Sequence, residues 1–334
     1  MKAYSRKICI FFYIFTSSMI SFGQHEYKLQ KLNKIDIPPE IIIGTISYLD
    51  IDNLGNLLIT DQMSKSVLLF TKSSMKFKNL SPVKCTPGFN WRPIYSIFNG
   101  NNILVINSLP WGYKFHKNGD CYKPMNYKFI APSFIINASE SKLVGYYNDD
   151  NGNILKMMDE DGNVLFTFGE FQKNFKNFIK RFSGGGLTTD EKGKYIFKMD
   201  VHSPVLHKYN LKGRLVDKKT FHLLNFHSID RDIKDNATNP ILIMKDLKII
   251  LEDKSTIKNF AYYSNEKFII VTLTNKKQYI HLVNINGEVL FESEIPEEIS
   301  YLNSKNGLLY FVEQPFIKNS EILPNPQIIL YEIK

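Results

Sequence analysis

A repeated hairpin signal constrains the fold of this chain more than any other feature. Four segments combine an alternating apolar run, a polar-Gly turn and a second alternating run: Tyr113–Tyr122, Leu155–Phe166, Leu206–Val216 and Ile280–Phe291. Asn-Gly or Asp-Gly between such runs predicts a β-hairpin in which both central residues have a positive φ. Repeats of about 40–50 residues with several strands in each are typical of β-propeller blades.

A second series of apolar strands runs in phase with the hairpins, and each of its members ends on a polar residue. The six members are Leu57–Asp61, Ile103–Asn107, Leu143–Asn148, Tyr195–Asp200, Phe268–Asn275 and Leu308–Gln314. Another strand precedes each of them across a turn. We therefore predict an all-β fold, a six-bladed β-propeller with four antiparallel strands in each blade. A long β-sandwich is the alternative.

The two ends of the chain predict how the ring closes. After Leu308–Gln314 only one more strand follows, Gln327–Lys334, so the last blade lacks its outer strand. The alternating segment Tyr27–Ile37 has no place in the first blade and could supply that strand. Such a closure would pair the final strand edge and fasten both termini.

The N-terminus carries the features of a secretory signal peptide. Lys2, Arg6 and Lys7 precede a short apolar run over residues 8–14, and small residues at Ser21 and Gly23 suggest cleavage before Gln24. We expect a signal peptide over 1–23 and a single propeller domain over 24–334, exported to the periplasm or the exterior. An insertion at about 224–256 breaks the blade period. No second apolar stretch reaches membrane-spanning length.

Charge and cysteine content narrow the classes of partner. The net charge of +9 falls to +6 without residues 1–23, a mild excess that we interpret as a solvated lysine-decorated face. Together with export, this argues against nucleic acid as a partner. Cys85 and Cys121 remain after cleavage, and they could form a disulfide or stay as two free thiols.

The segment Leu49–Phe70 has the strand, Asp-x-Asp turn, Gly-Asn pair and second strand ending in Asp of an NHL-like blade. On this stretch the chain resembles the secreted six-bladed, NHL-repeat-like propellers of Bacteroidetes. The resemblance implies fold and export, and it implies little about function. Asp50 and Asp52 also look like part of a calcium loop. The bidentate Glu of such a loop is missing, so we expect a hydrogen-bonded turn here.

The polar ends of the second strands form the first candidate site. If the blades are in register, Asp61, Asn107, Asn148 and Asp200 emerge on one face around the channel, as a possible divalent cation site for calcium. Such a ring is similar to the metal site of gluconolactonase-like propellers. The alternative to a metal is that these residues satisfy their own turns.

Aromatic residues near predicted strand ends form the second candidate site. Trp91, Arg92, Trp111 and Tyr113 flank the second blade and could stack on a sugar or a peptide, or pack between blades. Nucleophile motifs are absent from the sequence, and the Gly-rich run at 184–186 lacks the lysine of a phosphate loop, so we expect it to lead into the fourth blade.

From this inventory we predict a non-catalytic, monomeric propeller that requires no cofactor. It would bind a protein, peptide or glycan at the channel face. The alternative function is a metal-dependent hydrolase or lyase of the gluconolactonase-like type.

Overall fold

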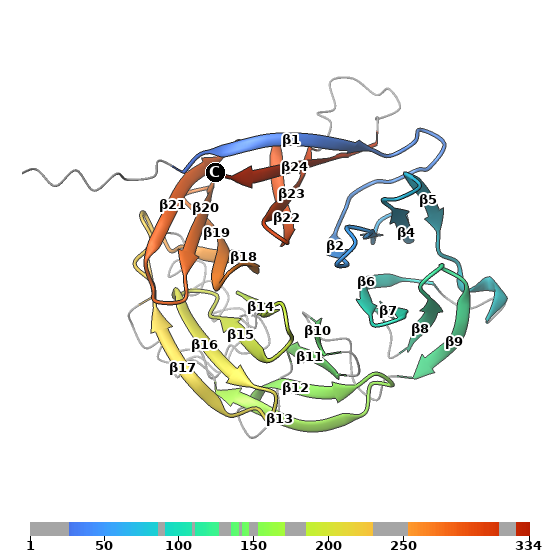
Figure 1. Ribbon diagram of the computed structural model, residues 1–334, viewed down its shortest axis with the longest axis horizontal. Helices are drawn as coiled ribbons and strands as arrows, with labels where there is room; N and C mark the ends of the chain where they lie inside the picture. Colours follow the sequence, from blue (N-terminus) through green and yellow to red (C-terminus); the bar gives the residue numbers. More distant parts are fainter. Residues whose placement is uncertain are drawn as a thin grey trace, which may run out of the picture.

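Six antiparallel sheets are arranged in a ring in the computed structural model (Figure 1). The structure describes residues 27–85, 91–108, 111–126, 135–139, 142–146, 153–170, 185–229, 253–313 and 325–334. Each sheet has four strands, and within each blade the strands follow one another from the channel to the rim. The predicted six-bladed β-propeller is confirmed.

The strands of blades 1 to 3 are β2 (Tyr48–Ile51), β3 (Leu57–Asp61), β4 (Ser66–Thr71), β5 (Lys76–Asn79), β6 (Pro93–Asn99), β7 (Asn102–Asn107), β8 (Trp111–His116), β9 (Cys121–Asn126), β10 (Ile135–Ser139), β11 (Lys142–Tyr146), β12 (Asn153–Asp159) and β13 (Val164–Glu170). Those of blades 4 to 6 are β14 (Gly186–Thr189), β15 (Tyr195–Met199), β16 (Val205–Asn210), β17 (Leu215–Thr220), β18 (Thr256–Ser264), β19 (Lys267–Thr274), β20 (Lys277–Asn284), β21 (Val289–Ile295), β22 (Ile299–Lys305), β23 (Leu308–Glu313), β24 (Gln327–Ile333) and β1 (Leu29–Asp36).

The N-terminal strand closes the ring, as the sequence predicts. β1 pairs antiparallel with β24, from Leu29 opposite Ile333 to Asp36 opposite Gln327. Beyond the ladder, Lys28 and Lys334 exchange backbone hydrogen bonds of 2.7 and 3.1 Å. Without β1, the outer edge of β24 would be exposed and able to pair with other chains.

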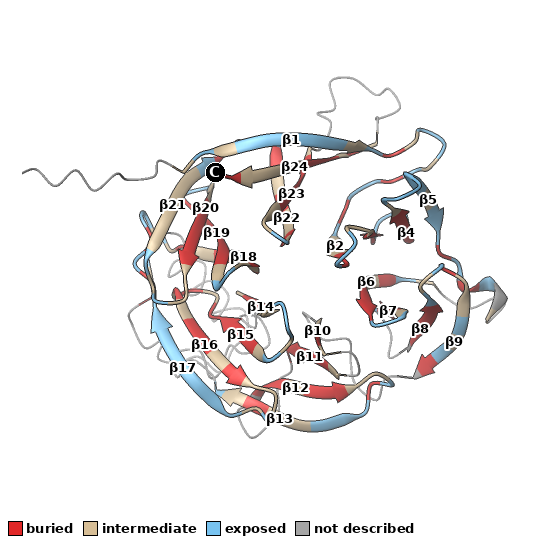
Figure 2. Ribbon diagram, viewed as in Figure 1, coloured by how far each residue is buried: buried red, intermediate tan, exposed pale blue. Residues whose placement is uncertain are grey.

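The core lies between neighbouring blades, because the inner strands bury side chains on both faces of each sheet. All five residues of β3 are buried, and Leu57 and Ile59 pack against Tyr310 and Val312 of blade 6. The outermost strands β1, β5 and β17 are largely exposed, whereas β21 is mostly half-buried (Figure 2). Each of the six predicted apolar segments corresponds to the second strand of its blade, which explains why their sequences are apolar at nearly every position.

The hairpin turns differ from the predicted form. Gly119, Gly162, Gly213 and Gly287 have positive φ, whereas the residues before them do not. These turns are three-residue loops with a bulge, in which the glycine N–H donates to the carbonyl three residues earlier. The physical reason in three of them is an Asp or Asn at that earlier position. Asp159, for example, accepts hydrogen bonds from the N–H groups of Asp161 and Asn163.

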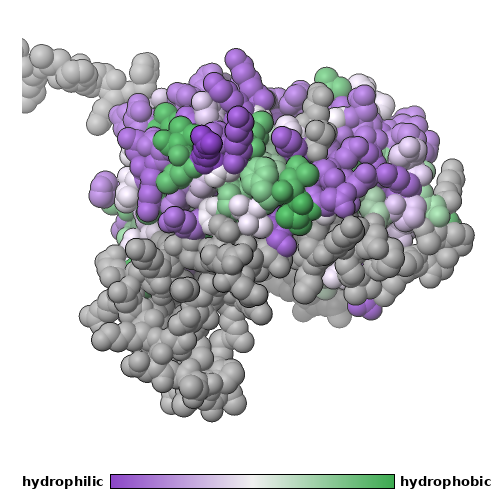
Figure 3. Space-filling model, turned by 90° about the horizontal axis from the view of Figure 1, so that it is seen from below, coloured by the Kyte–Doolittle hydropathy of each residue, from purple (hydrophilic) through white to green (hydrophobic). Residues whose placement is uncertain are grey.

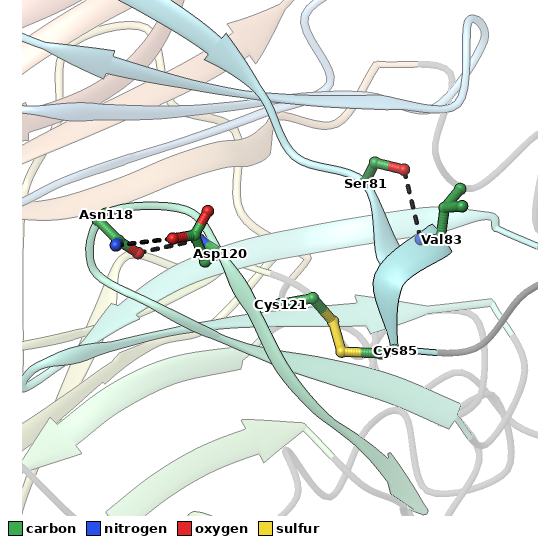
Figure 4. Close-up of a disulfide and its surroundings, with 6 residues drawn as sticks. All are labelled: Ser81, Val83, Cys85, Asn118, Asp120 and Cys121. Atoms are coloured by element: carbon green, nitrogen blue, oxygen red, sulfur yellow. Dashed lines mark hydrogen bonds between the residues drawn. A yellow bond between two sulfur atoms is a disulfide. The ribbon is translucent and has the colours of Figure 1, made fainter.

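Cys85 and Cys121 form a disulfide, which resolves the choice that the sequence leaves open (Figure 4). Their Cα atoms are 5.9 Å apart. Cys85 follows the short 3₁₀ turn η1 (Pro82–Lys84), whose first turn is capped by Ser81, and Cys121 begins β9. The bond therefore fastens the connection between blades 1 and 2 to the rim of blade 2.

Two predicted features lie wholly or largely outside the described residues. The signal peptide, 1–23, precedes them, and of the insertion at 224–256 only its two ends are described. Within the described ranges no helix has the length and hydropathy needed to span a membrane.

Candidate functional site

The six innermost strands surround a central channel with a cavity of about 870 Å³. Figure 1 shows these strands, β2, β6, β10, β14, β18 and β22, nearest the centre of the ring. The cavity is lined by tyrosines, by short polar side chains and by charged side chains of both signs. A cavity of this volume is within the range of small-ligand sites.

Side chains of neighbouring blades cap the inner edge of these strands. Asp50 on β2 accepts a hydrogen bond from the N–H of Phe98 on β6, at 2.7 Å. Asn259 on β18 donates to the carbonyl of Leu302 on β22, at 2.9 Å. Each first strand has one edge without a neighbouring strand, and these contacts satisfy backbone groups along it. Short polar residues in the channel wall therefore hold the blades together.

The Asn side chain of β22 continues this pattern around the ring. Asn303 donates to the carbonyl of Leu49 on β2, at 2.9 Å, and so links the last blade to the first. Thr188 on β14 accepts a hydrogen bond from the N–H of Tyr262 on β18, at 3.0 Å. The lining is thus largely pre-organised, because its polar groups are already fixed by backbone contacts.

Tyr48, Asp50 and Tyr95 form a cluster in the channel wall between blades 1 and 2. The two tyrosine rings meet edge to face with centroids 5.1 Å apart. Burial raises the pKa of Asp50 to about 6, although the Phe98 N–H and the Lys305 ammonium act in the opposite direction. Burial, followed by the Asp50 charge, also raises the pKa of Tyr48. A carboxyl group and two phenols therefore share one partly desolvated part of the wall.

The charged residues at the mouth of the channel are balanced and partly paired. Lys117 approaches Asp52 at 3.1 Å. Burial acts to raise the pKa of Asp52, but hydrogen bonds from Asn56 and Lys117 outweigh it and hold the pKa below its ordinary value. Asp52 also accepts from the N–H groups of Leu54 and Asn56. This is the predicted hydrogen-bonded turn.

The predicted metal ligand Asp61 is buried at the end of β3 and serves its own loop. Its two carboxylate oxygens accept hydrogen bonds from the N–H groups of Gly44, Met63 and Ser64 and from the Ser64 hydroxyl, at 2.5 to 3.1 Å. Asn107, at the end of β7, is buried, and its amide has no hydrogen-bond partner among the described residues. Asn148 lies outside the described residues.

Asp200 lies in a buried charged cluster within blade 4. Lys198 donates to one carboxylate oxygen, and His207 Nε2 lies 3.0 Å from the other. Burial favours a higher pKa for Asp200, but the charge of Lys198 and the contact with His207 lower it overall. Blades 1 and 4 lie across the ring from each other (Figure 1), and Asp61 and Asp200 each bind partners close to them in the chain. Among the described residues, no group of three His, Cys, Asp or Glu side chains is placed to hold a metal ion.

The predicted aromatic site is divided between core and surface. Trp91 is half-buried, with its ring centroid 5.5 Å from that of Tyr113 and 6.2 Å from that of Phe115. Tyr113 is buried in the same cluster, beside the disulfide, so its ring packs between blades. Arg92 is exposed. Trp111 begins β8, and its side chain is not among those described.

The sequence patterns did not point to the Tyr48–Asp50–Tyr95 cluster. In the sequence, Asp50 stands out only as part of the Asp-x-Asp turn motif with Asp52. The sequence did contain a signal for this cluster. Tyr48 and Asp50 are two residues apart, so in a strand their side chains lie on the same face. The partner Tyr95 is more than forty residues away, and only the ring brings it close.

Comparison with solved structures supports the architecture. An exported protein from Bacteroides fragilis superposes with a TM-score of 0.66 at 12% identity, over 93% of this chain and 96% of that one. The fold is that of a six-bladed β-propeller. A PQQ-bound aldose sugar dehydrogenase from Streptomyces coelicolor gives 0.50 at 9% identity, over 92% and 99%. A streptogramin B lyase gives 0.50 at 10% identity, over 92% and 98%.

At such identities the likeness concerns the fold alone. No protein-family profile matches the sequence, and no curated protein matches it.

Proposed function

We propose that this protein is an exported, non-catalytic β-propeller that binds a glycan in its central channel. The observation that carries the proposal is the Tyr48–Asp50–Tyr95 cluster in the wall of the channel. Aromatic rings suit the apolar faces of sugars, and a fixed carboxylate accepts hydrogen bonds from sugar hydroxyls. Both kinds of group are held here in a cavity of suitable volume.

Pre-organisation supports a binding role. The Asp50 carboxylate is oriented by the Phe98 N–H, and Asn259 and Asn303 are fixed by backbone carbonyls. A ligand that enters such a site meets groups already in place, so little conformational freedom is lost on binding.

Export and family are part of the same proposal. The basic start, apolar run and small residues of 1–23 support a signal peptide and a periplasmic or extracellular location. The blade pattern of Leu49–Phe70 supports a place among the NHL-repeat-like secreted propellers of Bacteroidetes. N-terminal sequencing of the exported protein should begin at Gln24.

A glycan array followed by calorimetry with the best ligand tests the binding proposal. We expect Asp50→Asn to weaken binding about tenfold, because the neutral amide is a poorer acceptor for sugar hydroxyls, and Tyr95→Leu to weaken it similarly. The matched control is Asp217→Asn, an exposed carboxylate on the rim. If Arg92→Ala reduces affinity while both channel variants bind normally, the site lies at the aromatic cluster instead. Binding of peptides but no glycan would assign another class of ligand.

The metal-dependent hydrolase or lyase has a separate test. Elemental analysis of the purified protein would have to find one divalent ion that is lost in Asp61→Ala or in Asp200→Ala, each tested separately. A metal-free protein would remove this alternative.

A further inference from the structure

The outer rim of blades 3 and 4 exposes apolar side chains that the fold does not cover. Leu215 and Val216, at the start of β17, are 53% and 50% exposed. Val164 and Leu165, at the start of β13, are 41% and 49% exposed. Gly213 in the β16–β17 turn lies against Phe166 and Phe168, so this turn packs on the middle of β13. Exposed apolar groups gathered in this way mark interaction surfaces.

Cations flank this apolar rim. Lys212 and Arg214 precede Leu215, and Lys218 and Lys219 follow Val216, and all four are exposed. None of the four forms an ion pair with the part of the chain that the structure describes. The only acidic residue of β17 is Asp217, whose side chain accepts from its neighbour's N–H. Figure 3, which views the molecule from this side, shows apolar side chains between hydrophilic ones.

The corresponding strand of the next blade has different chemistry. On β21, Glu292 is bound by His281 and Glu294 by Lys277, at 2.8 and 2.9 Å. Within the described residues, the cations of β17 thus lack the carboxylate partners that the cations of blade 5 find on β21. Lysines on an edge strand can simply prevent pairing with other strands. That role does not explain the exposed Leu215 and Val216 beside them.

We propose that this rim, defined by residues 212–219, docks on an anionic phospholipid surface. Lysine and arginine attract anionic headgroups, and apolar side chains between them enter the interface. A convex rim fits a flat lipid surface, whereas a peptide would need a groove.

Vesicle flotation with the exported full-length protein tests the proposal. The protein should float with vesicles of phosphatidylglycerol and phosphatidylcholine in equal parts, and stay behind with pure phosphatidylcholine. Lys218→Glu with Lys219→Glu should lower the partition coefficient roughly tenfold or more. The matched control is Lys76→Glu, an exposed lysine on the outer strand β5, which should change it about twofold at most.

A second variant tests the apolar contribution. Leu215→Gln with Val216→Thr should weaken vesicle binding, and the loss relative to the parent protein should be larger at high salt than at low salt. At high salt the charges are screened, so only the apolar contacts hold the protein on the vesicle. All substituted positions are exposed, so thermal unfolding should not change. Equal flotation with both vesicle types, or with Lys218→Glu and Lys219→Glu in place, would overturn the proposal. So would capture of an acidic peptide by a protein that ignores anionic vesicles.

Discussion

The carboxylate of Asp50 in blade 1 accepts a hydrogen bond of 2.7 Å from the backbone N–H of Phe98 in blade 2. This contact joins the two innermost strands where neither has a strand neighbour on the channel side. It also holds an ionisable group in a poorly solvated wall, and burial raises the pKa of that group to about 6.

The raised pKa predicts a pH-dependent stability. The folded protein binds the Asp50 proton more tightly than the unfolded chain does, so the contribution of Asp50 to stability falls as pH rises from about 4 to 6. Asp50→Asn keeps an acceptor for Phe98 and removes the charge. We expect it to increase the free energy of unfolding at pH 7 by roughly 1–2 kcal/mol and to change little at about pH 4. Urea unfolding at both pH values measures this, and an unchanged pH slope would contradict it.

The buried Lys198–Asp200–His207 cluster predicts a large cost for losing its carboxylate. Asp200→Asn leaves the Lys198 ammonium buried without a counter-charge, which should cost about 3–5 kcal/mol. The control Lys277→Met breaks the exposed pair with Glu294 and should cost less than about 1 kcal/mol. Because the pKa of Asp200 is lowered, its contribution should be lost as the pH falls through the acid range. Denaturant midpoints of the two variants measure these two losses of stability. Similar midpoints would contradict the presence of a buried charged cluster.

The disulfide predicts a redox-dependent stability. It closes a sequence separation of 36 residues, so Cys85→Ser with Cys121→Ser should lower the free energy of unfolding by about 3–4 kcal/mol. Dithiothreitol should destabilise the parent protein similarly and leave the double variant unaffected. Two titratable thiols in the untreated protein would show that the bond does not form.

Two glycines with a positive φ, Gly185 before blade 4 and Gly307 in the β22–β23 turn of blade 6, predict contrasting effects of substitution. Gly185 has a φ of 99°, and a Cβ there would collide with the carbonyl oxygen of Met199. Gly185→Ala should destabilise the protein by roughly 3 kcal/mol or more. Gly307 has a φ of 74° but nothing within 4 Å of the added carbon, so Gly307→Ala should cost only about 1 kcal/mol. Thermal melts of the two variants measure the difference, and equal melting temperatures would argue against a collision at Gly185.

The strand pattern was predictable because burial leaves a direct trace in sequence. Second strands lie between two other blades, so both faces need apolar residues, as in Leu57–Asp61 and Lys267–Thr274. The ring closure was predictable because the last blade lacks one strand and the alternating segment Tyr27–Ile37 has no place in the first blade. The turn geometry was predicted incorrectly, because an Asp-Gly pair fits both two-residue and three-residue loops. The side chain of Asp159, outside that pair, favours the longer one.

The site was less predictable, since strand ends do not reveal what surrounds them. Asp61 and Asp200 do lie at the ends of apolar runs, as expected. Their partners are Gly44 and its loop for the first, and Lys198 with His207 for the second. Whether these carboxylates ever meet a metal stays a prediction.

The sequence alone determined the number of blades, the order of strands and the closure by residues 29–36, because alternation and turn residues are local properties. Only the tertiary structure decided which polar groups share the channel. Tyr48 and Tyr95, or Asn303 and Leu49, meet because the ring brings the free edges of six distant strands around one axis. A period of two in a strand tells which face a side chain takes, but not what lies opposite it.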